Sequence, residues 1–330
     1  MRAADVEPYL GYVLERTDFK HLGRKSGGKV RDVYTQSVPR DGRQNDRVIL
    51  VSTDRYTAFD RQLGLVPFKG AVNTQIAKFW FERTATTIPN HVLAFPDPNV
   101  LVARRLKMLP VEMIVRGFMT GVTSTSLWTQ YNDEGRREFD GFILPRGMDK
   151  NQRLERPVIT PTTKLERHDR NISTEEVLGG LAIKRSHWDD MQAVALALFE
   201  RGQAIAEERG LVLVDTKYEF GVDEEGKLYL ADEIHTPDSS RFWLRANYEE
   251  QVGKGLEPDY YDKEFGRIWF TERCDPYHDA ELPVAASDML AELACRYVTV
   301  YEKLTKETFT FDPSQPIVER IENNLFAFQV

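Results

Sequence analysis

The chain has 330 residues, of which 41% are hydrophobic and 29% charged, which is enough to bury the core of one large domain or of two lobes. Its 52 acidic residues exceed its 44 basic ones, and the resulting net charge of −8 argues against a general binder of nucleic acid or of anionic membranes. The two cysteines have no metal-ligand spacing, and the sequence contains neither an apolar signal segment nor the ~18 apolar residues of a membrane span. We therefore expect a soluble, cytoplasmic protein with reduced thiols.

Predicted strands dominate the first third of the chain. A glycine pair leads into a strand over residues 27–36, and a short apolar strand covers residues 47–53. Apolar side chains at helical spacing predict a helix over residues 73–84. Two further strands, residues 99–106 and 110–117, are expected to be joined tightly by "KMLP".

The glycine-rich stretch "SGGKVRDVY" fits neither the GxGxxG fingerprint nor the Walker A pattern. Gly27 and Gly28 permit backbone amides to approach a phosphate, and Lys29 and Arg31 share one face of the strand that follows. An exposed strand with two basic residues is the simpler interpretation, so this stretch alone leaves both open.

The strand "PVEMIVRGF" carries two charged side chains, Glu112 and Arg116. The pattern predicts a buried strand, and a charged side chain on a buried strand needs a partner or a ligand. The histidines of the chain form no HxxxH or HxH pair, so nothing supports a structural zinc site.

The middle of the chain begins with a polar region, residues 130–175, whose prolines, threonines and charges predict a long loop near a site. Residues 186–210 have the clearest helical periodicity, with Ser186 and Asp189 spaced as a capping box and Gly210 at the end.

The remaining elements are a hairpin over residues 211–233 around a "DEEG" turn and a long helix over residues 287–307, with Ser287 as its cap. Strands and helices do not alternate at the spacing that a parallel sheet needs. We therefore expect an α+β fold with antiparallel sheets in two lobes, residues 1–108 and 109–330, that meet at a cleft.

One face of the first hairpin strand is charged, because Asp215, Lys217 and Glu219 alternate along it while the other face is mainly apolar. An acid–base–acid face does not point into an apolar core. It either faces solvent, with charge pairs across the hairpin, or lines a polar site, and the hairpin alone leaves both open.

The hairpin register decides which acid lies beside Glu219. A four-residue turn places Glu219 opposite Leu230 and Asp232 on the Glu219 face, whereas a three-residue turn offers Glu233 instead. Two carboxylates together with substrate phosphates are a usual way to hold Mg²⁺. We predict Glu219 and Asp232 as the metal ligands.

The stretch "TPDSSR" supplies hydrogen-bond donors one step beyond these acids. Arg241 can bind a carboxylate or phosphate with two parallel hydrogen bonds, and Ser239 and Ser240 add hydroxyls. Asp238 would accept from an amine or a sugar hydroxyl. This combination favours a site over a plain surface turn.

Six stretches together resemble the SAICAR synthetase family, the phosphoribosylaminoimidazole-succinocarboxamide synthases of purine biosynthesis. They occur in the family's order over most of residues 28–243, and the six are "GKVRDVY", "STDRYTAFD", "PVEMIVRGFMTG", "PVITPTTK", "LVDTKYEFG" and "DEIHTPDSSRFW". Residues 244–330 carry little of this signature.

The resemblance implies a two-lobed fold, similar in outline to ATP-grasp and kinase-like nucleotide enzymes, and a cytoplasmic ligase. The implied reaction joins L-aspartate to the carboxylate of CAIR, an aminoimidazole ribonucleotide, while ATP becomes ADP and phosphate. The small-molecule partners are then ATP, CAIR and L-aspartate, with Mg²⁺ as the metal, and neither nucleic acid nor a membrane is involved. A homo-oligomer is compatible with the sequence.

The resemblance also implies roles for individual residues. It places Lys217 beside the transferring phosphate and Arg241 among the catalytic residues, and it repeats the metal pair of Glu219 and Asp232. Asp54 and Arg55 are weaker candidates near the aspartate. The remaining assignments are Gly28, Lys29 and Arg31 over the ATP phosphates, Glu112, Met113 and Ile114 on a strand that reads adenine, Lys164 closing over the nucleotide, and Arg116, Asp238, Ser239, Ser240 and Arg241 on CAIR.

The chain departs from the family at Val122, where many members have a serine that helps to hold the ribonucleotide. Either the Thr123 hydroxyl substitutes for it or the contact is missing. Two other functions remain open from the sequence. One is a small-molecule kinase, although no kinase HRD or DFG set is present. The other is a nucleotide-binding module without activity.

Overall fold

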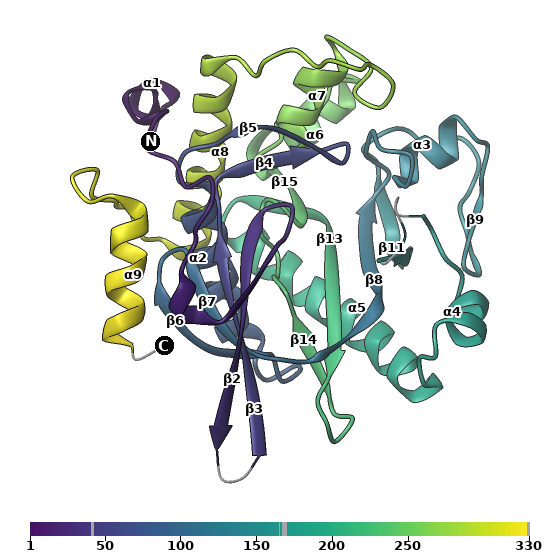
Figure 1. Ribbon diagram of the computed structural model, residues 1–330. Coiled ribbons are helices and arrows are strands. Elements are labelled where there is room, and N and C mark those ends of the chain that lie inside the picture. The colour runs from purple at the N-terminus through teal and green to yellow at the C-terminus, as the bar shows by residue number, and fades with distance from the viewer. Residues whose placement is uncertain (41–42, 165, 167–169, 329–330) are drawn as a thin grey trace. The chain divides into compact units, whose positions relative to one another are not determined.

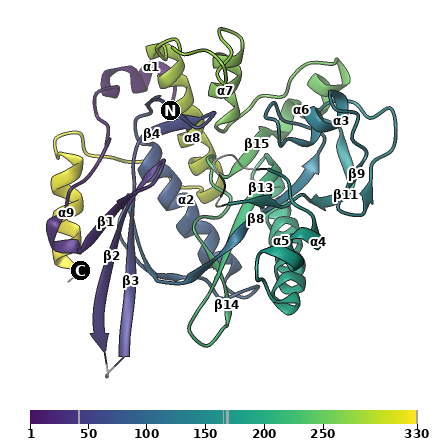
Figure 2. The ribbon, with the colours of Figure 1, turned by 45° about the vertical axis from the view of Figure 1, so that its right-hand side comes forward.

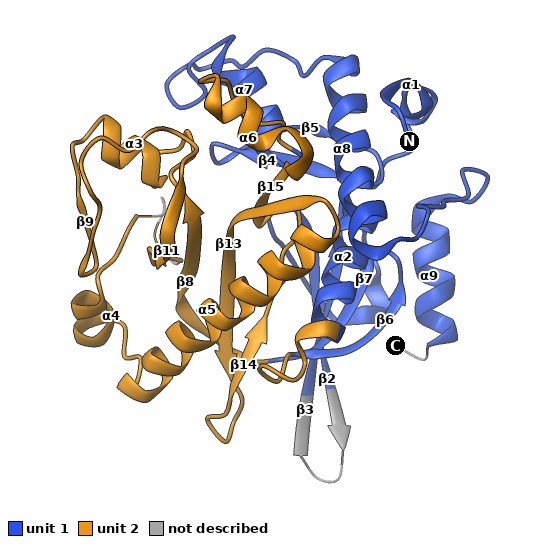
Figure 3. Cartoon of the chain, turned by 180° about the vertical axis from the view of Figure 1, so that it is seen from behind, with its two compact units in different colours: residues 1–82, 91–105, 261–330 blue, residues 83–90, 106–260 orange. Residues whose placement is uncertain are grey.

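A computed structural model describes residues 1–40, 43–164, 166 and 170–328 (Figure 1). The chain forms two compact units, coloured separately in Figure 3. Unit 1 comprises residues 1–82, 91–105 and 261–330, and unit 2 comprises residues 83–90 and 106–260. No helix in this described part of the chain is long and apolar enough to cross a membrane.

The compact units differ from the continuous segments 1–108 and 109–330 expected for the two lobes. Near that expected boundary the chain passes from unit 1 to unit 2 between Arg105 and Leu106, but residues 261–330 group with the N-terminal part. The reason is packing, because α8 (Ser287–Thr305) contacts α1 (Ala3–Val6), and α9 (Ile317–Ala327) contacts β6 (Val92–Asp97).

Unit 1 is built on a five-stranded antiparallel sheet. The strand order is β1 (Arg24–Gly27), β2 (Arg31–Arg40), β3 (Arg43–Ser52), β7 (Val100–Arg104) and β6. The strands predicted around residues 27–36 and 47–53 are therefore confirmed, with β2 starting after the glycine pair. A two-stranded sheet, β4 (Arg55–Ala58) with β5 (Arg61–Leu65), follows in the chain.

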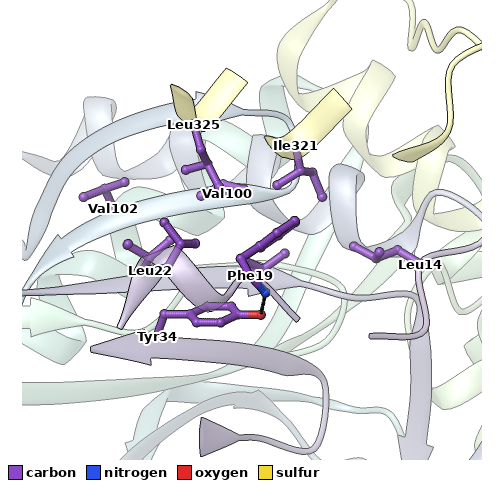
Figure 4. Close-up of a cluster of buried hydrophobic side chains, with 10 residues drawn as sticks. Leu14, Phe19, Leu22, Tyr34, Val100, Val102, Ile321 and Leu325 are labelled. Carbon is purple, nitrogen blue, oxygen red and sulfur yellow. Dashed lines mark hydrogen bonds between the residues drawn. The ribbon is translucent and has the colours of Figure 1, made fainter. Parts of the chain in front are cut away.

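A buried apolar cluster joins this sheet to the two ends of the chain (Figure 4). Ile321 and Leu325 of α9 belong to the same cluster as side chains of β2, β3 and β7. Its members are Leu14, Phe19, Leu22, Tyr34, Ile49, Val51, Val100, Val102, Ile321 and Leu325. The buried Tyr34 hydroxyl accepts a hydrogen bond from the Phe19 N–H at 3.0 Å.

The predicted helix over residues 73–84 is confirmed as α2 (Lys69–Thr84), and that over residues 287–307 as α8. The expected cap was wrong, since Ser287 is the first helical residue and Ala286 occupies the N-cap without a side-chain bond. Short elements complete unit 1: the 3₁₀ turns Glu7–Tyr9 and Lys20–Leu22, and α7 (Glu264–Thr271).

Unit 2 is built on a second antiparallel sheet with the strand order β11 (Arg153–Ile159), β8 (Lys107–Phe118), β13 (Leu211–Val222) and β14 (Leu228–Ala231). In addition, β12 (Thr162–Thr163) pairs with β8, and β15 (Ser240–Leu244) pairs with β13. Figures 1 and 2 show α5 (Arg185–Glu208) alongside β13 and β8, both of which it contacts. The α+β class with antiparallel sheets is confirmed.

Three details of unit 2 correct the expectations. "KMLP" is not a connection but the start of β8, and β8 pairs with β13 rather than with β7. Helix α5 is confirmed, but its N-cap is Lys184 rather than Ser186. Gly210 ends it as predicted, because it takes a φ of +74°.

The polar region 130–175 is also more ordered than the expected loop. Its apolar side chains build a second buried cluster that includes Tyr131, Phe139 and Leu154. Residues 165 and 167–169 lie outside the described residues. The elements of this region and the remaining helix of unit 2 are α3 (Leu127–Asn132), β9 (Glu138–Phe139), β10 (Phe142–Ile143), α4 (Thr174–Gly180) and α6 (Arg245–Gly253).

Candidate active site

One face of β13 carries the charged side chains that the alternation predicted. Asp215 and Glu219 are only 5% and 4% exposed, so the solvated-face alternative is wrong. Lys217, between them, contacts carboxylates on both β8 and β13. Along a strand, two residues span roughly 7 Å, so this face presents one charged group after another at nearly regular intervals.

The hairpin turn is one residue longer than expected. Glu219 lies opposite Ala231 rather than Leu230, and Val222 opposite Leu228. The longer turn is stabilised locally, because the Asp223 carboxylate accepts from the Lys227 N–H at 2.8 Å and Gly226 takes a φ of +81°. The predicted register is therefore wrong by one residue.

Glu219 stands between two lysines. Its Oε1 contacts the Lys217 Nζ at 2.7 Å, and its Oε2 forms an ion pair with Lys164, which follows β12. The Lys217 Nζ also donates to Glu112 Oε1 at 2.8 Å, and Glu112 lies opposite Glu219 in the ladder between β8 and β13. The structure thus brings together Lys164, Lys217 and Glu219, which the sequence had placed near the nucleotide.

The carboxylates of Asp232 and Glu233 also affect the pKa of Lys217. Burial by itself would lower the pKa of the Lys217 ammonium, but the carboxylates of Glu112, Asp232 and Glu233 outweigh it and raise that pKa above its usual value. Strand β14 ends at Ala231, and Asp232 takes a left-handed φ of +65°, so strict alternation no longer decides which acid faces the cluster. Lys217 therefore remains a cation among carboxylates.

Glu233 is partly committed elsewhere, because its Oε2 accepts from the Thr236 hydroxyl at 2.5 Å. That bond ties Glu233 to the turn that follows. The choice of Asp232 as the second metal ligand stays a prediction.

The charge balance around Lys217 fits a divalent cation. Among the residues named here, the four carboxylates of Glu112, Glu219, Asp232 and Glu233 outnumber the two ammonium groups of Lys164 and Lys217. Within the described ranges, no three His, Cys, Asp or Glu side chains are grouped as a complete metal site. A partial protein shell of carboxylates, completed by substrate phosphates, is what Mg²⁺ usually uses.

A second cluster, two residues along the same strand face, contains two arginines around one carboxylate. Asp215 Oδ2 forms an ion pair with Arg241 of β15 and lies 3.6 Å from the Arg116 Nη1 of β8. Arg116 also donates to the Thr160 hydroxyl at 2.7 Å and to the Thr125 carbonyl at 2.8 Å. The two guanidinium groups thus meet at one carboxylate. Guanidinium groups bind carboxylates and phosphates with parallel hydrogen bonds, so a pair of arginines suits an anionic ligand.

The segment 236–240 is a tight turn that leads into β15. The Ser240 N–H donates to the Thr236 carbonyl at 2.9 Å, and the Ser239 carbonyl accepts from the Lys217 N–H at 3.0 Å. The Ser240 hydroxyl lies 2.7 Å from that of Thr216. Asp238 is half-exposed in the same turn. The turn thus connects the strand that carries Arg241 to the strand that carries Lys217.

Gly121 allows the loop 120–126 to lie close to Arg241. It has a φ of +106°, and a Cβ there would come within 3.0 Å of the Arg241 Nη2 and 2.4 Å of the Ser126 Cβ. The Ser126 hydroxyl donates to the Thr123 carbonyl at 2.6 Å, so this loop folds around its own polar groups. Thr123 and Val122 are both half-buried here, and whether Thr123 replaces the family serine stays a prediction.

The strand expected to read adenine is a central strand. Glu112, Met113 and Ile114 pair with β13 on one side, and on the other Thr162 pairs with Glu112 while the Thr160 N–H donates to the Ile114 carbonyl. The sheet therefore already uses much of this backbone. We expect Glu112 to act instead through its side chain, by contacting Lys217.

The glycine-rich turn lies in unit 1. The Gly28 N–H donates to the Arg31 carbonyl at 2.8 Å, which closes the turn, and the Lys29 ammonium contacts Asp60 at 2.5 Å. Gly28 is exposed and Arg31 half-buried, so the turn remains accessible to a ligand.

Asp54 and Arg55 have contacts that favour a structural role over the aspartate-binding one. Asp54 is 1% exposed, and its carboxylate accepts from the N–H groups of Leu14 at 2.6 Å and Gly70 at 2.8 Å. Burial raises the pKa of Asp54 to about 6 despite these bonds. Arg55 is 8% exposed and bonds within unit 1.

The sequence missed two features of unit 2. Asp215 was placed on the charged face but not recognised as the shared partner of two arginines, although its alternation with Lys217 was a usable signal. The second feature is a buried pair, in which the Tyr218 hydroxyl lies 2.5 Å from the His235 Nε2. His235 is fully buried against Gly202 of α5, where an added Cβ would come within 2.4 Å of its ring.

This buried histidine predicts acid-sensitive stability. Burial lowers the pKa of His235 to about 3 in the folded protein, against about 6.5 when unfolded. Below pH 6.5 the unfolded chain gains a proton that the folded chain does not, so this group makes stability fall as pH drops from 6.5 towards 3. Between pH 7 and pH 5 the free energy of unfolding should fall by roughly 2 kcal/mol through this group.

The measurement is urea unfolding at both pH values for the wild type and for His235→Asn. Asparagine keeps a polar side chain and tolerates the left-handed φ of +47° at this position, but it does not titrate. The variant should therefore lose less stability between pH 7 and pH 5. Equal losses in the two proteins would show that His235 does not cause the effect.

The chain is similar in sequence to a known protein family. A family model described as SAICAR synthetase matches residues 24–283. The phosphoribosylaminoimidazole-succinocarboxamide synthase of Legionella pneumophila (strain Lens) is 49% identical over 305 residues, covering 92% of this chain and 95% of that protein. Its chloroplastic counterpart in Arabidopsis thaliana is 46% identical over 298 residues, covering 90% of this chain and 70% of that protein.

Among solved structures, the SAICAR synthase from Saccharomyces cerevisiae complexed with SAICAR matches with a TM-score of 0.74 at 28% identity. The match covers 90% of this chain and 100% of that chain. It confirms the expected fold, whereas the likeness to ATP-grasp and kinase-like enzymes stays a prediction.

Proposed function

We propose how particular residues carry out the ligase reaction, from the premise that the chain belongs to the SAICAR synthetase family and has its ATP-dependent activity in purine biosynthesis. That activity joins L-aspartate to the carboxylate of CAIR. A carboxylate is a poor acylating agent because oxide would have to leave. We infer that the reaction passes through an acyl phosphate.

In the first step a CAIR carboxylate oxygen attacks the γ-phosphorus of ATP, the bond to the β–γ bridging oxygen breaks, and ADP leaves. In the second step the aspartate nitrogen attacks the acyl carbon, and the bond from that carbon to the phosphate oxygen breaks. Phosphate leaves, and the nitrogen loses a proton as the amide forms. Because the first nucleophile is already an anion, positioning and charge neutralisation carry most of the catalysis.

The observation that supports this proposal most directly is the pair of clusters on one face of β13. One gathers carboxylates and lysines around Glu219, and the other holds Arg116 and Arg241 around Asp215. A metal–phosphate site and an anionic acceptor site are the two environments that this chemistry needs side by side.

On the nucleotide side, Glu219 and Asp232 would hold Mg²⁺, which when bound neutralises charge on the phosphate oxygens. Lys217 is a point cation two residues from Glu219, where it would stabilise charge developing on the transferred phosphoryl group. Lys164, already paired with Glu219, would close over the nucleotide. In unit 1, Gly28, Lys29 and Arg31 would bind the ATP phosphates.

On the acceptor side, Arg241 is the main candidate for an anionic group of CAIR, with Arg116 behind it. Arg116 is 3% exposed and bonded to Thr160, so we expect it chiefly to support the site. The turn residues Asp238, Ser239 and Ser240 would contact the ribonucleotide as well. No residue is proposed for the aspartate.

The acyl phosphate is tested by following oxygen. CAIR labelled with ¹⁸O in its carboxylate is incubated with Mg-ATP and L-aspartate, and the phosphate released is analysed by mass spectrometry. One labelled oxygen should appear in each phosphate, because the acyl carbon–oxygen bond breaks in the second step. Unlabelled phosphate would rule out the acyl phosphate while leaving the ligase activity intact.

Omitting aspartate is the control that separates the ligase from a kinase-like activity. With CAIR and Mg-ATP alone, ADP release should fall well below the full rate. A cytoplasmic location and a homo-oligomer stay predictions, for which cell fractionation and light scattering are the measurements.

A further inference from the structure

The glycine-rich turn of unit 1 is held from within by one arginine. Arg55, at the start of β4, donates from its Nη2 to the Gly28 carbonyl at 3.0 Å and from its Nε to the Lys29 carbonyl at 3.1 Å. The next carbonyl, that of Val30, accepts from the N–H and the hydroxyl of Thr53 at 3.0 and 2.8 Å. Three successive carbonyl groups are therefore fixed by residues 53 and 55.

These bonds determine where the amides of the turn point. In a planar trans peptide the carbonyl and the following N–H point in opposite directions. Because the Gly28 and Lys29 carbonyls face Arg55, the N–H groups of Lys29 and Val30 face away from it. Successive N–H groups directed to one side form an anion-binding concavity.

Arg55 is itself rigidly anchored. Its Nη1 and Nη2 lie 3.2 and 3.1 Å from Asp32 Oδ1, and it also donates to the Glu15 carbonyl. The other Asp32 oxygen accepts from the N–H and hydroxyl of Thr17 at 2.6 and 3.0 Å. Asp32 is 2% exposed, so this ion pair is shielded from water, and breaking it would leave a buried charge.

We propose that Arg55 is a positioning residue for phosphate binding: with Asp32 it holds the turn so that the N–H groups of Lys29 and Val30 point at the ATP phosphates. Arg55 does not touch the nucleotide in this assignment. The inference rests on the proposed placement of the ATP phosphates at Gly28–Arg31, and it adds which groups of the turn bind them and what orients those groups.

The test is Arg55→Lys, assayed with the full-length enzyme. Lysine keeps a positive charge near Asp32 but lacks the fork that reaches two carbonyls and the carboxylate together. The KM for ATP should rise about tenfold, which corresponds to about 1.4 kcal/mol, while the KM values for CAIR and aspartate change by less than about twofold.

The matched control is Arg320→Lys. Arg320 of α9 forms a similar ion pair in the same unit, with its Nε 3.0 Å from Asp97 Oδ2 and its Nη2 3.2 Å from Asp97 Oδ1. It should lower the melting temperature without raising the KM for ATP selectively. If both variants shift the KM for ATP equally at similar stability loss, Arg55 is merely structural and the inference is overturned.

Thr53→Val is the alternative variant if Arg55→Lys does not fold. Thr53→Val is nearly isosteric and removes one of the two donors to the Val30 carbonyl, so the KM for ATP should rise about threefold. An unchanged KM would overturn the role of these carbonyl bonds.

Arg31→Gln separates the inference from the proposed function. A raised KM for ATP in Arg31→Gln, with no change in Arg55→Lys and Thr53→Val, overturns the positioning role and leaves the turn as an ATP site. If none of the three variants changes the KM for ATP, the placement of ATP at this turn is overturned along with the inference.

Discussion

Replacing Glu219 by glutamine is expected to lower the rate of ADP release by about a thousandfold. Loss of a group that stabilises charge in the transition state typically has an effect of this size. The amide has the same shape as the carboxylate, so the buried position remains filled. It lacks the charge that pairs with Lys164 and Lys217 and that we propose to hold Mg²⁺. The measurement is steady-state ADP release in the presence of CAIR and aspartate, titrated with Mg²⁺.

The matched control for this prediction is Glu112→Gln. Glu112 lies opposite Glu219 and contacts the same ammonium, the Lys217 Nζ, at 2.8 Å, against 2.7 Å for Glu219. Both variants remove one carboxylate from Lys217, but only Glu219→Gln removes a proposed metal ligand. Glu112→Gln should therefore lose only about tenfold and keep the wild-type Mg²⁺ requirement. Equal losses with equal Mg²⁺ requirements would show that Glu219 acts only through Lys217.

The sequence could predict the charged face of β13 because side-chain alternation in a strand is a local property. Asp215, Lys217 and Glu219 fall on one side whatever the rest of the fold does. The register could not be predicted with the same accuracy. It depends on the turn, where the Asp223 carboxylate and the left-handed Gly226 accommodate one more residue than "DEEG" suggested.

Roles that depend on long-range contacts were the hardest to predict. Nothing in the sequence around Arg55 shows that its partners are the carbonyls of Gly28 and Lys29, more than 20 positions earlier. The assignment of Asp54 and Arg55 to the aspartate site therefore stays a prediction, and the contacts of both residues favour a structural role. The grouping of residues 261–330 with unit 1 also depends on long-range contacts, and the sequence motifs gave little sign of it.

Arginine geometry is the basis of the second large prediction, in which Arg241→Lys raises the KM for CAIR by about a hundredfold. Arg241 is 8% exposed and ion-paired with Asp215, so its guanidinium is held in one orientation. A lysine would still neutralise Asp215, but it would lose the planar fork that binds a carboxylate or phosphate with two hydrogen bonds. The KM for ATP should change by less than about threefold, because we propose that the nucleotide binds at the other cluster.

Arg245→Lys is the matched control, since Arg245 lies just after the same strand and donates from its Nη1 to the Glu207 carbonyl at 3.3 Å. It should leave all three KM values unchanged. Equal losses for CAIR and ATP in Arg241→Lys would contradict the assignment of the arginine cluster around Asp215 to CAIR. A selective loss for CAIR would support a division of labour along β13, in which Asp215 orients the arginine that binds the acceptor, and Glu219, two positions beyond Lys217, serves the nucleotide.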